Sequence, residues 1–483
     1  MHSADSLLQH AYDPERFRRT GHQLIDQLAD FLASARHSPD APVIRWQEPD
    51  ALRAAWAAEP LAQGPDALPG LFARVLEQTV RTQSPRYVGH QIAPAAPAAA
   101  LAALLGALLN NGMGVYEMGM AGTVLEQEVV RLMNRQLGYG PASGGFLTSG
   151  GSLGNLTALL AARQAQTGFD AWEEGATPQP LAVMVSEQAH YCVARAAKVM
   201  GLGEAGVIKV PVDARFRMRT ELLDGLLAEA QAAGRQVIAI AGSACTTATG
   251  SFDDLAAIAA FAQRHGIWFH VDAAHGGPTI FSRRYRGLVA GIELADSVVV
   301  DFHKMMLTPA LATAVLFRSE AVSFNTFAQK ASYLWDRAQD REWYNLAKRT
   351  FECTKQMMGL EVFALLHAYG PELFAEHVDT VYGLGAEFAG MVRARDAMEL
   401  AHEPQCNIVC FRYAPPGMEP EACDALNQAI RTQLLREGRY YMVQTRLGGR
   451  LWLRVSLMNP FTDGAVLHGL LDAVEAAGRA YAG

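Results

Sequence analysis

The sequence VVVDFHKMMLTP, residues 298–309, places a lysine directly after a run of β-branched residues. Such a run predicts a buried strand, and ligands of α/β proteins bind beyond the carboxyl ends of the strands. Lys304 at this position either pairs with an acid or carries an amine neutral enough to attack a carbonyl group. Because Asp301 and His303 lie in the same stretch, the residues by themselves leave both alternatives open.

The composition predicts a globular cytoplasmic protein. The chain has 483 residues, 19% of them charged, and its net charge of −8 gives no reason to expect nucleic acid or a membrane as a partner. Its six cysteines form neither a CxxC pair nor a His/Cys metal spacing, so no metal site is expected. The N-terminus shows no secretory signal. The Ala-rich stretch 92–109 is marginal in length for a membrane span, and we expect a helix there from about Pro97.

Strand-like and helical segments alternate between residues 144 and about 317. The strand-like segments are 145–147, 181–185, 206–210, 237–241, 267–271 and 297–300, and the helical ones include 156–166, 221–233 and 255–265. This alternation predicts an α/β fold with a mostly parallel sheet that helices cover on both faces.

The flanking parts of the chain predict two further regions. Amphipathic spacing predicts helices at 17–35 and 68–81, and the glycine-rich stretch 110–119 is interpreted as a loop that can form a pocket wall. A long helical pattern at 346–369 leads into a mixture of helices and strands. We therefore predict an N-terminal helical segment at 1–85, a large domain at 86–365 and a small α+β domain at 366–483.

Four features of the sheet region match the groups of one ligand, although each of them alone also fits a structural role. The loop TSGGSLGN, residues 148–155, precedes a helix, and helix N-termini bind anions such as phosphate. The imidazole of His190 can stack on a planar ring. Asp272 follows the strand-like run IWFHV, and a buried carboxylate there calls for a cationic partner. Together with the amine of Lys304, the set matches the phosphate, ring, ring nitrogen and aldehyde of pyridoxal 5'-phosphate.

In these motifs and their order, the chain resembles the group II pyridoxal phosphate-dependent amino acid decarboxylases. The resemblance runs from about Ser84 to the C-terminus, and its most specific parts are HVDAAHGG (270–277) and DFHK (301–304). It implies the type I aminotransferase fold with a seven-stranded sheet, and a homodimer with active sites at the subunit interface. It also implies a carboxy-lyase that converts an L-amino acid into its amine and carbon dioxide through an external aldimine and a quinonoid.

The resemblance assigns roles toward the cofactor. Lys304 corresponds to the Schiff-base lysine, Asp272 to the aspartate that keeps the ring nitrogen protonated, and His190 to the histidine stacked on the ring. Further residues correspond to positions that surround the cofactor in the family: Gly151, Ser152, Thr247, Ala274 and His303.

The resemblance also assigns roles toward the substrate. Tyr333 corresponds to a loop tyrosine that protonates the carbanion after carbon dioxide leaves, with Tyr344 as its rival. Arg454 corresponds to an arginine that holds the α-carboxylate in some members, and a guanidinium suits that planar anion. The remaining candidates for the substrate pocket are His90, Gln91 and Tyr116.

Two departures from the family bear on the substrate and the chemistry. Many relatives have asparagine and proline where this chain has Asp301 and Phe302, which adds a negative charge near Lys304. The stretch GMGVYEMG, residues 112–119, lacks the bulky side chains of the aromatic decarboxylases and favours an acyclic, polar substrate. An aldehyde synthase or other oxidative decarboxylase, an aminotransferase, a lyase and a non-catalytic binding partner remain as alternatives.

Overall fold

The computed structural model describes residues 6–38, 41–175, 179–327 and 342–482. The chain divides into two compact units. The larger unit comprises Gln91–Ala389 and His402–Cys410, and the smaller one comprises Met1–His90, Gly390–Ala401 and Phe411–Gly483. The three-part division at 1–85, 86–365 and 366–483 stays a prediction.

A seven-stranded sheet forms the centre of the larger unit, in the order β1-β7-β6-β5-β4-β2-β3. Only β7 runs antiparallel to its neighbours β1 and β6, and the other pairs are parallel. The mostly parallel sheet is therefore confirmed. Its strands are β1 (Gly144–Thr148), β2 (Leu181–Ser186), β3 (Val207–Val210), β4 (Gln236–Ser243), β5 (Trp268–Asp272), β6 (Ser297–Asp301) and β7 (Thr313–Phe317).

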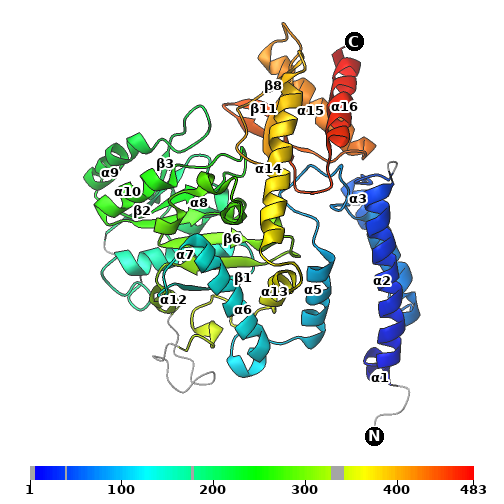
Figure 1. Cartoon of the computed structure of the whole chain (residues 1–483), viewed down its shortest axis with the longest axis horizontal. Coiled ribbons are helices and arrows are strands. Elements are labelled where there is room, and N and C mark those ends of the chain that lie inside the picture. Colours follow the sequence, from blue (N-terminus) through cyan, green and yellow to red (C-terminus); the bar gives the residue numbers. More distant parts are fainter. Residues whose placement is uncertain (1–5, 39–40, 176–178, 328–341, 483) are drawn as a thin grey trace. The chain divides into compact units, whose positions relative to one another are not determined.

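Helices pack on both faces of this sheet (Figure 1). Ala239 and Ala241 of β4 share a buried core with residues of α7 and α8. Gly242 points the other way, toward Leu255 and Ile258 of α10. The alternation along β4 thus places α7 and α8 on one face and α10 on the other. The helices around the sheet are α7 (Gly151–Gln166), α8 (Tyr191–Val199), α9 (Leu223–Ala232), α10 (Leu255–His265), α11 (Phe302–Met305) and α12 (Glu320–Thr326).

The rest of the larger unit corrects two local expectations. The glycine-rich loop ends at Val115, and α6 continues through Gly119 although that residue has non-helical angles of φ −124° and ψ 16°. The predicted helix at 346–369 is wrong in its first half, where only a short 3-10 helix forms before α13. Between this 3-10 helix and α13, the side chains of Glu352 and Lys355 bond to distant parts of the unit instead. The helices concerned are α5 (Pro97–Leu109), α6 (Tyr116–Leu137), α13 (Met358–Tyr369) and α14 (Glu372–Arg393).

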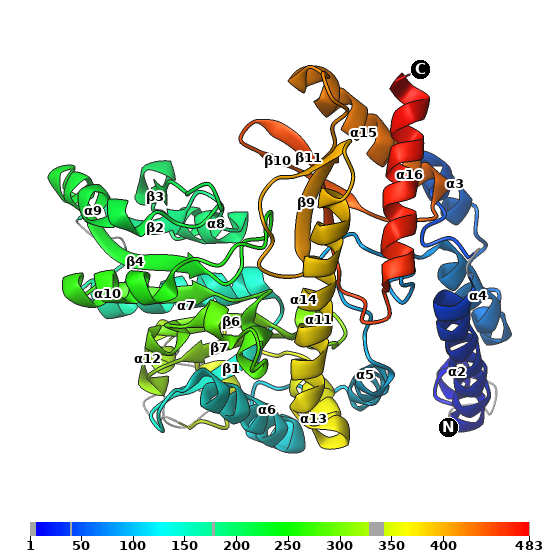
Figure 2. The same ribbon diagram turned by 45° about the horizontal axis from the view of Figure 1, so that its top comes forward.

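The smaller unit combines N-terminal helices with a C-terminal sheet in the order β10-β11-β9-β8. Figure 2 shows α15 and α16 next to the strands of this sheet. The N-terminal helices are α1 (Leu7–Ala11), α2 (Pro14–His37), α3 (Pro49–Ala57) and α4 (Leu68–Gln78). The C-terminal elements are β8 (Met398–Leu400), β9 (Ile408–Tyr413), α15 (Pro420–Glu437), β10 (Val443–Leu447), β11 (Arg450–Ser456) and α16 (Gly464–Ala482).

Short 3-10 helices complete the described chain. They are η1 (Pro65–Ala67), η2 (Glu204–Gly206), η3 (Thr220–Leu222), η4 (Gly277–Phe281), η5 (Arg286–Val289), η6 (Ile292–Leu294) and η7 (Leu346–Lys348). Among the residues that the structure describes, no helix is both long enough and apolar enough to cross a membrane.

Candidate active site

Lys304 lies one turn beyond the carboxyl end of β6, in the four-residue helix α11. Phe302 and Met305 of this helix are fully buried, whereas the side chain of Lys304 keeps 21% of its surface exposed. Its Nζ lies 2.9 Å from Oδ2 of Asp301. Burial is the largest single influence and lowers the pKa of Lys304, but the charge and hydrogen bond of Asp301, together with the charge of Asp272, outweigh it and raise the pKa above its usual value. These contacts hold the lysine as a cation paired with Asp301.

Asp301 is buried and has partners on three sides. The Thr313 hydroxyl donates to its Oδ1 over 2.5 Å, and Nε2 of His303 lies 3.7 Å from its Oδ2. A Cβ on Gly151 would lie 2.9 Å from both carboxylate oxygens, so only glycine fits at this first residue of α7. Burial raises the pKa of Asp301, but the charges of Lys304 and His303 outweigh that effect and hold the pKa below its usual value.

Asp272 and His190 lie at the ends of neighbouring elements. Asp272 is the last residue of β5, only 8% exposed, and its Oδ1 accepts a hydrogen bond from the amide of Ala274 over 3.1 Å. His190 caps α8, with its Nδ1 accepting from the amide of Cys192 over 3.4 Å. Burial lowers the pKa of His190, while the charges of Asp272, Lys304 and Asp301 also act on it. The set follows the carboxyl ends of β2, β5 and β6, which run parallel, so the topology brings these residues to one edge of the sheet.

The N-terminus of α7 supplies the anion-binding part of the set. Gly150 has φ +101°, a left-handed value that favours glycine, and α7 begins at the next residue. The first amides of a helix have no partner within the helix, so those of Gly151 and Ser152 are suited to a phosphate. An anion site, an amine, a buried carboxylate and an imidazole form a donor set that fits pyridoxal phosphate.

The other predicted cofactor residues lie around this set. Ala274 is buried directly after β5, and Thr247 is half-buried in the turn that follows β4. His303 is 8% exposed, and its Nδ1 lies 3.1 Å from the carbonyl oxygen of Ala312.

The predicted substrate residues fall into both units. Arg454 lies in β11 of the smaller unit and is 6% exposed. Partial burial lowers the pKa of His90 in the same unit, followed in effect by the charges of Arg454 and Arg431.

In the larger unit, the ring of Tyr116 packs edge-on against Tyr344, with 5.6 Å between the ring centres. Gln91 is 9% exposed. Tyr333 lies outside the residues that the structure describes.

The carboxylate of Glu352, which the sequence did not indicate, contacts the glycine-rich loop 148–155. Oε1 of Glu352 accepts hydrogen bonds from both hydroxyls of Thr148 and Ser149 and from the amide of Ser149, at 2.8 to 3.0 Å. Lys355 nearby forms a buried ion pair of 2.6 Å with Glu126. No local sequence pattern marks these contacts, because each joins residues more than 200 positions apart.

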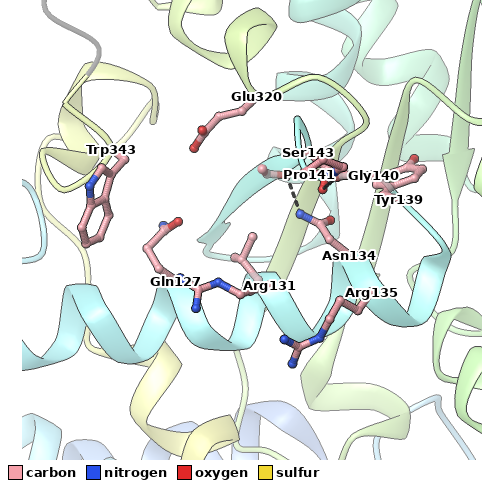
Figure 3. Close-up of a pocket in the computed structure, with 12 residues that line it drawn as sticks. Gln127, Arg131, Asn134, Arg135, Tyr139, Gly140, Pro141, Ser143, Glu320 and Trp343 are labelled. Atoms are coloured by element: carbon pink, nitrogen blue, oxygen red, sulfur yellow. Dashed lines mark hydrogen bonds between the residues drawn. The ribbon is translucent and has the colours of Figure 1, made fainter.

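A separate pocket of about 610 Å³ lies along α6 (Figure 3). Arg131 and Arg135 project from that helix, and Glu320 lies across from them. Glu320 is held by Arg349, whose Nη1 is 2.6 Å from its carboxylate. None of the predicted site residues lines this pocket, and its lining contains no lysine for Schiff-base chemistry.

The sheet and the set at its carboxyl end define a class of protein, the pyridoxal phosphate enzymes of the type I aminotransferase fold. The comparisons with known proteins then narrow this class. Residues 58–414 match the model of the pyridoxal-dependent decarboxylase conserved domain. The chain is 32% identical to L-2,4-diaminobutyrate decarboxylase of Rhizobium meliloti over 84% of its own length and 81% of that relative.

Two comparisons extend over nearly the whole chain. Human cysteine sulfinic acid decarboxylase is 28% identical over 99% of this chain and 100% of its own. The crystal structure of mouse CSAD superimposes with a TM-score of 0.90 at 26% identity, covering 96% of this chain and 99% of that one. The chain therefore belongs to the pyridoxal-dependent decarboxylase family, and it is a pyridoxal phosphate-dependent amino acid decarboxylase.

Proposed function

We propose that this enzyme removes the α-carboxylate of an acyclic, polar L-amino acid, with Lys304 as the residue that binds the cofactor covalently. The observation that carries the proposal is the position of the Lys304 amine. It lies beyond a central parallel strand, beside Asp301 and under the electrostatic influence of Asp272. A lysine so placed combines solvent access with a base that can accept its proton.

The residues of the cofactor set have complementary tasks. Pyridoxal phosphate, when bound, supplies an aldehyde that combines with amines and a ring that accepts the electron pair left behind when carbon dioxide departs. The first amides of α7, at Gly151 and Ser152, would bind the phosphate, with His303 near it and Thr247 near the cofactor. Asp272 would keep a proton on the ring nitrogen, because a buried carboxylate favours a cationic partner. His190 would stack on the ring, and Ala274 would pack against it.

The remaining site residues act on the substrate. Arg454 binds its carboxylate through paired hydrogen bonds, and Tyr333 donates the proton that replaces carbon dioxide. His190, whose pKa burial lowers, is neutral at physiological pH and suited to relay that proton. Gln91 and Tyr116 of the larger unit and His90 of the smaller unit stay predicted residues for the pocket wall.

The substrate class rests on the relatives and on the sequence around Tyr116. The relatives are named for diaminobutyrate, cysteine sulfinic acid and aspartate, all of which are acyclic and polar. The pair Tyr116 and Glu117 resembles the glutamate decarboxylases here more than the aromatic decarboxylases. Charged side chains on a short carbon chain therefore suit this pocket better than an indole or a phenol.

The proposed working unit is a homodimer. Helix α5 buries Ala99 and Ala102 but leaves five leucines 45% to 62% exposed: Leu101, Leu104, Leu105, Leu108 and Leu109. An apolar surface of this kind on a helix is typical of an interface between subunits. Light scattering after gel filtration should give twice the chain mass for the wild type and a smaller mass for a Leu104→Glu/Leu108→Glu variant.

The central test measures products and cofactor attachment together. Purified holoenzyme should release carbon dioxide and an equal amount of amine from diaminobutyrate, aspartate or cysteine sulfinate, without peroxide. Aldehyde, ammonia and peroxide would instead favour the oxidative alternative. Lys304→Ala should lose the absorbance of the covalently attached cofactor, whereas the exposed control Lys209→Ala should keep it; retained absorbance and turnover in Lys304→Ala would refute the proposal.

A further inference from the structure

Three buried polar side chains form a connected row beneath the candidate site. Asn155, His270 and Ser297 are each at most 1% exposed. Oδ1 of Asn155 lies 2.7 Å from Nε2 of His270, and Nδ1 of His270 lies 2.9 Å from Oγ of Ser297. At one end of the row, Nδ2 of Asn155 donates to the carbonyl oxygen of Gly151 over 2.8 Å. The row therefore ends at the first residue of α7.

The direction of the hydrogen bonds follows from Asn155. Its Nδ2 donates to Gly151, so its Oδ1 faces Nε2 of His270 and can only accept. A neutral His270 therefore carries its proton on Nε2, and its Nδ1 accepts the proton of the Ser297 hydroxyl. The indole of Trp268 donates to the same hydroxyl oxygen over 2.9 Å. Burial lowers the pKa of His270 to about 4, with Asp272 as the charged group that acts on it in the opposite direction.

The row connects α7, β5 and β6, the three elements that carry the candidate site. His270 and Asp272 are two positions apart in β5, and His270 pairs in register with Ser297, the first residue of β6. Strand β6 leads directly to Asp301 and Lys304, whereas Gly151 begins α7. A shift in any one of these elements would break a bond in the row. The row thus sets the spacing between the anion site, the ring-nitrogen partner and the lysine.

We propose that Asn155 and His270 are positioning residues that hold the Gly151 turn at a fixed distance from Asp272 and Lys304, and so control how firmly the cofactor is retained. The proposal rests on the proposed role of Gly151 in binding phosphate. Asn155 also has Cys192 at 3.5 Å from its Nδ2, so its amide is held from two sides. Neither residue needs to touch the cofactor, and no proton moves along the row.

Asn155→Asp is the sharpest test, because it changes no heavy-atom shape. The new carboxylate cannot donate to the Gly151 carbonyl, which already accepts the Asn155 backbone amide within α7, and instead repels its oxygen. We expect cofactor release into cofactor-free buffer, followed by absorbance, to become about tenfold faster. The new carboxylate also raises the pKa of His270, so release should acquire a pH dependence between about pH 5 and 8. If Asn155 only fills space, the substitution Asn155→Asp should not make the rate of cofactor release depend on pH.

Asn427→Asp provides a matched control. Asn427 is fully buried and likewise donates to backbone carbonyls, those of Tyr413 and Cys423, but it lies in the smaller unit. This variant should lower the melting temperature without changing cofactor release. Ser297→Ala serves as the second variant if Asn155→Asp does not fold; it removes the hydroxyl that donates to Nδ1 of His270 and should speed cofactor release about threefold.

The outcomes distinguish the positioning role of the row from the phosphate-binding role of Gly151. Wild-type release rates in both Asn155→Asp and Ser297→Ala would overturn the positioning role. If Gly151→Ala also released cofactor at the wild-type rate, the phosphate assignment would fail instead. Faster release in Asn155→Asp and Gly151→Ala, together with unchanged release in Asn427→Asp, would support the positioning role.

Discussion

The carboxylate of Asp301 lies 2.9 Å from the amine of Lys304 and is itself fixed by the hydroxyl of Thr313. In the proposed function, the two alternatives for a lysine at the end of a strand, an ion pair or a nucleophile, are successive states of one side chain. Asp301 pairs with the cation and is placed to accept a proton when the amine reacts.

This relationship predicts that Asp301→Asn lowers the pKa of Lys304. The charge and hydrogen bond of Asp301 are the largest influences that raise this pKa against burial, so their removal leaves burial to dominate. The amine should then be neutral, and reactive, at lower pH. Labelling of the cofactor-free enzyme with a small acylating reagent across a pH series, read at Lys304 by mass spectrometry, measures the shift. The exposed control Asp224→Asn should leave the midpoint unchanged; an unchanged midpoint in Asp301→Asn would contradict the prediction.

The buried ion pair between Glu126 and Lys355 predicts a large loss of stability when one partner is removed. Both side chains are at most 3% exposed, and Glu126 also accepts from the amide of Leu147 over 2.9 Å. Lys355→Met leaves an uncompensated buried carboxylate, which costs about 3–5 kcal/mol. Thermal unfolding of the cofactor-free enzyme should show this loss, with much of it recovered in Lys355→Met/Glu126→Gln. The exposed pair of Arg18 and Glu15 offers the comparison, and Arg18→Met should have almost no effect.

Glu361 predicts a pH-dependent stability. Burial raises its pKa from 4.5 to about 7. The unfolded chain loses this proton at lower pH than the folded chain does, so stability falls as the pH rises from 4.5 to 7. Glu361→Gln stays neutral and should raise the melting temperature more at pH 8 than at pH 6, by an amount equivalent to about 1 kcal/mol. An equal change at both pH values, or the same behaviour in the exposed control Glu387→Gln, would contradict this reasoning.

The two candidate tyrosines can be separated by matched substitutions. If Tyr333 donates the final proton, Tyr333→Phe should slow amine formation by about 100-fold or more while the spectrum of the resting holoenzyme is unchanged. Tyr344→Phe removes only the hydroxyl of a ring that packs against Tyr116, and should change kcat much less. The reverse result would transfer the role to Tyr344.

Local sequence signals predicted much of the fold. Helix α10 has the predicted bounds, because it is followed by the left-handed Gly266 and has an aspartate cap at Asp254. The predicted strand segments agree with the observed strands to within a few residues. The helix expected at 346–369 failed in its first half because Glu352 and Lys355 bond to β1 and α6. Such tertiary bonds override helical periodicity.

The sequence by itself determined the chemical groups and the strands that carry them: an amine after β6, a carboxylate at the end of β5 and a glycine turn before α7. Hydrophobic periodicity and glycine positions act over a few residues, so they can be read along the chain. Only the tertiary structure decided which residues surround the carboxylate of Asp301. Thr313 bonds to Asp301 from the neighbouring strand, and Gly151 meets the same carboxylate from 150 positions away. Electrostatic and steric contacts of this kind depend on distance in space, which the order of residues does not specify.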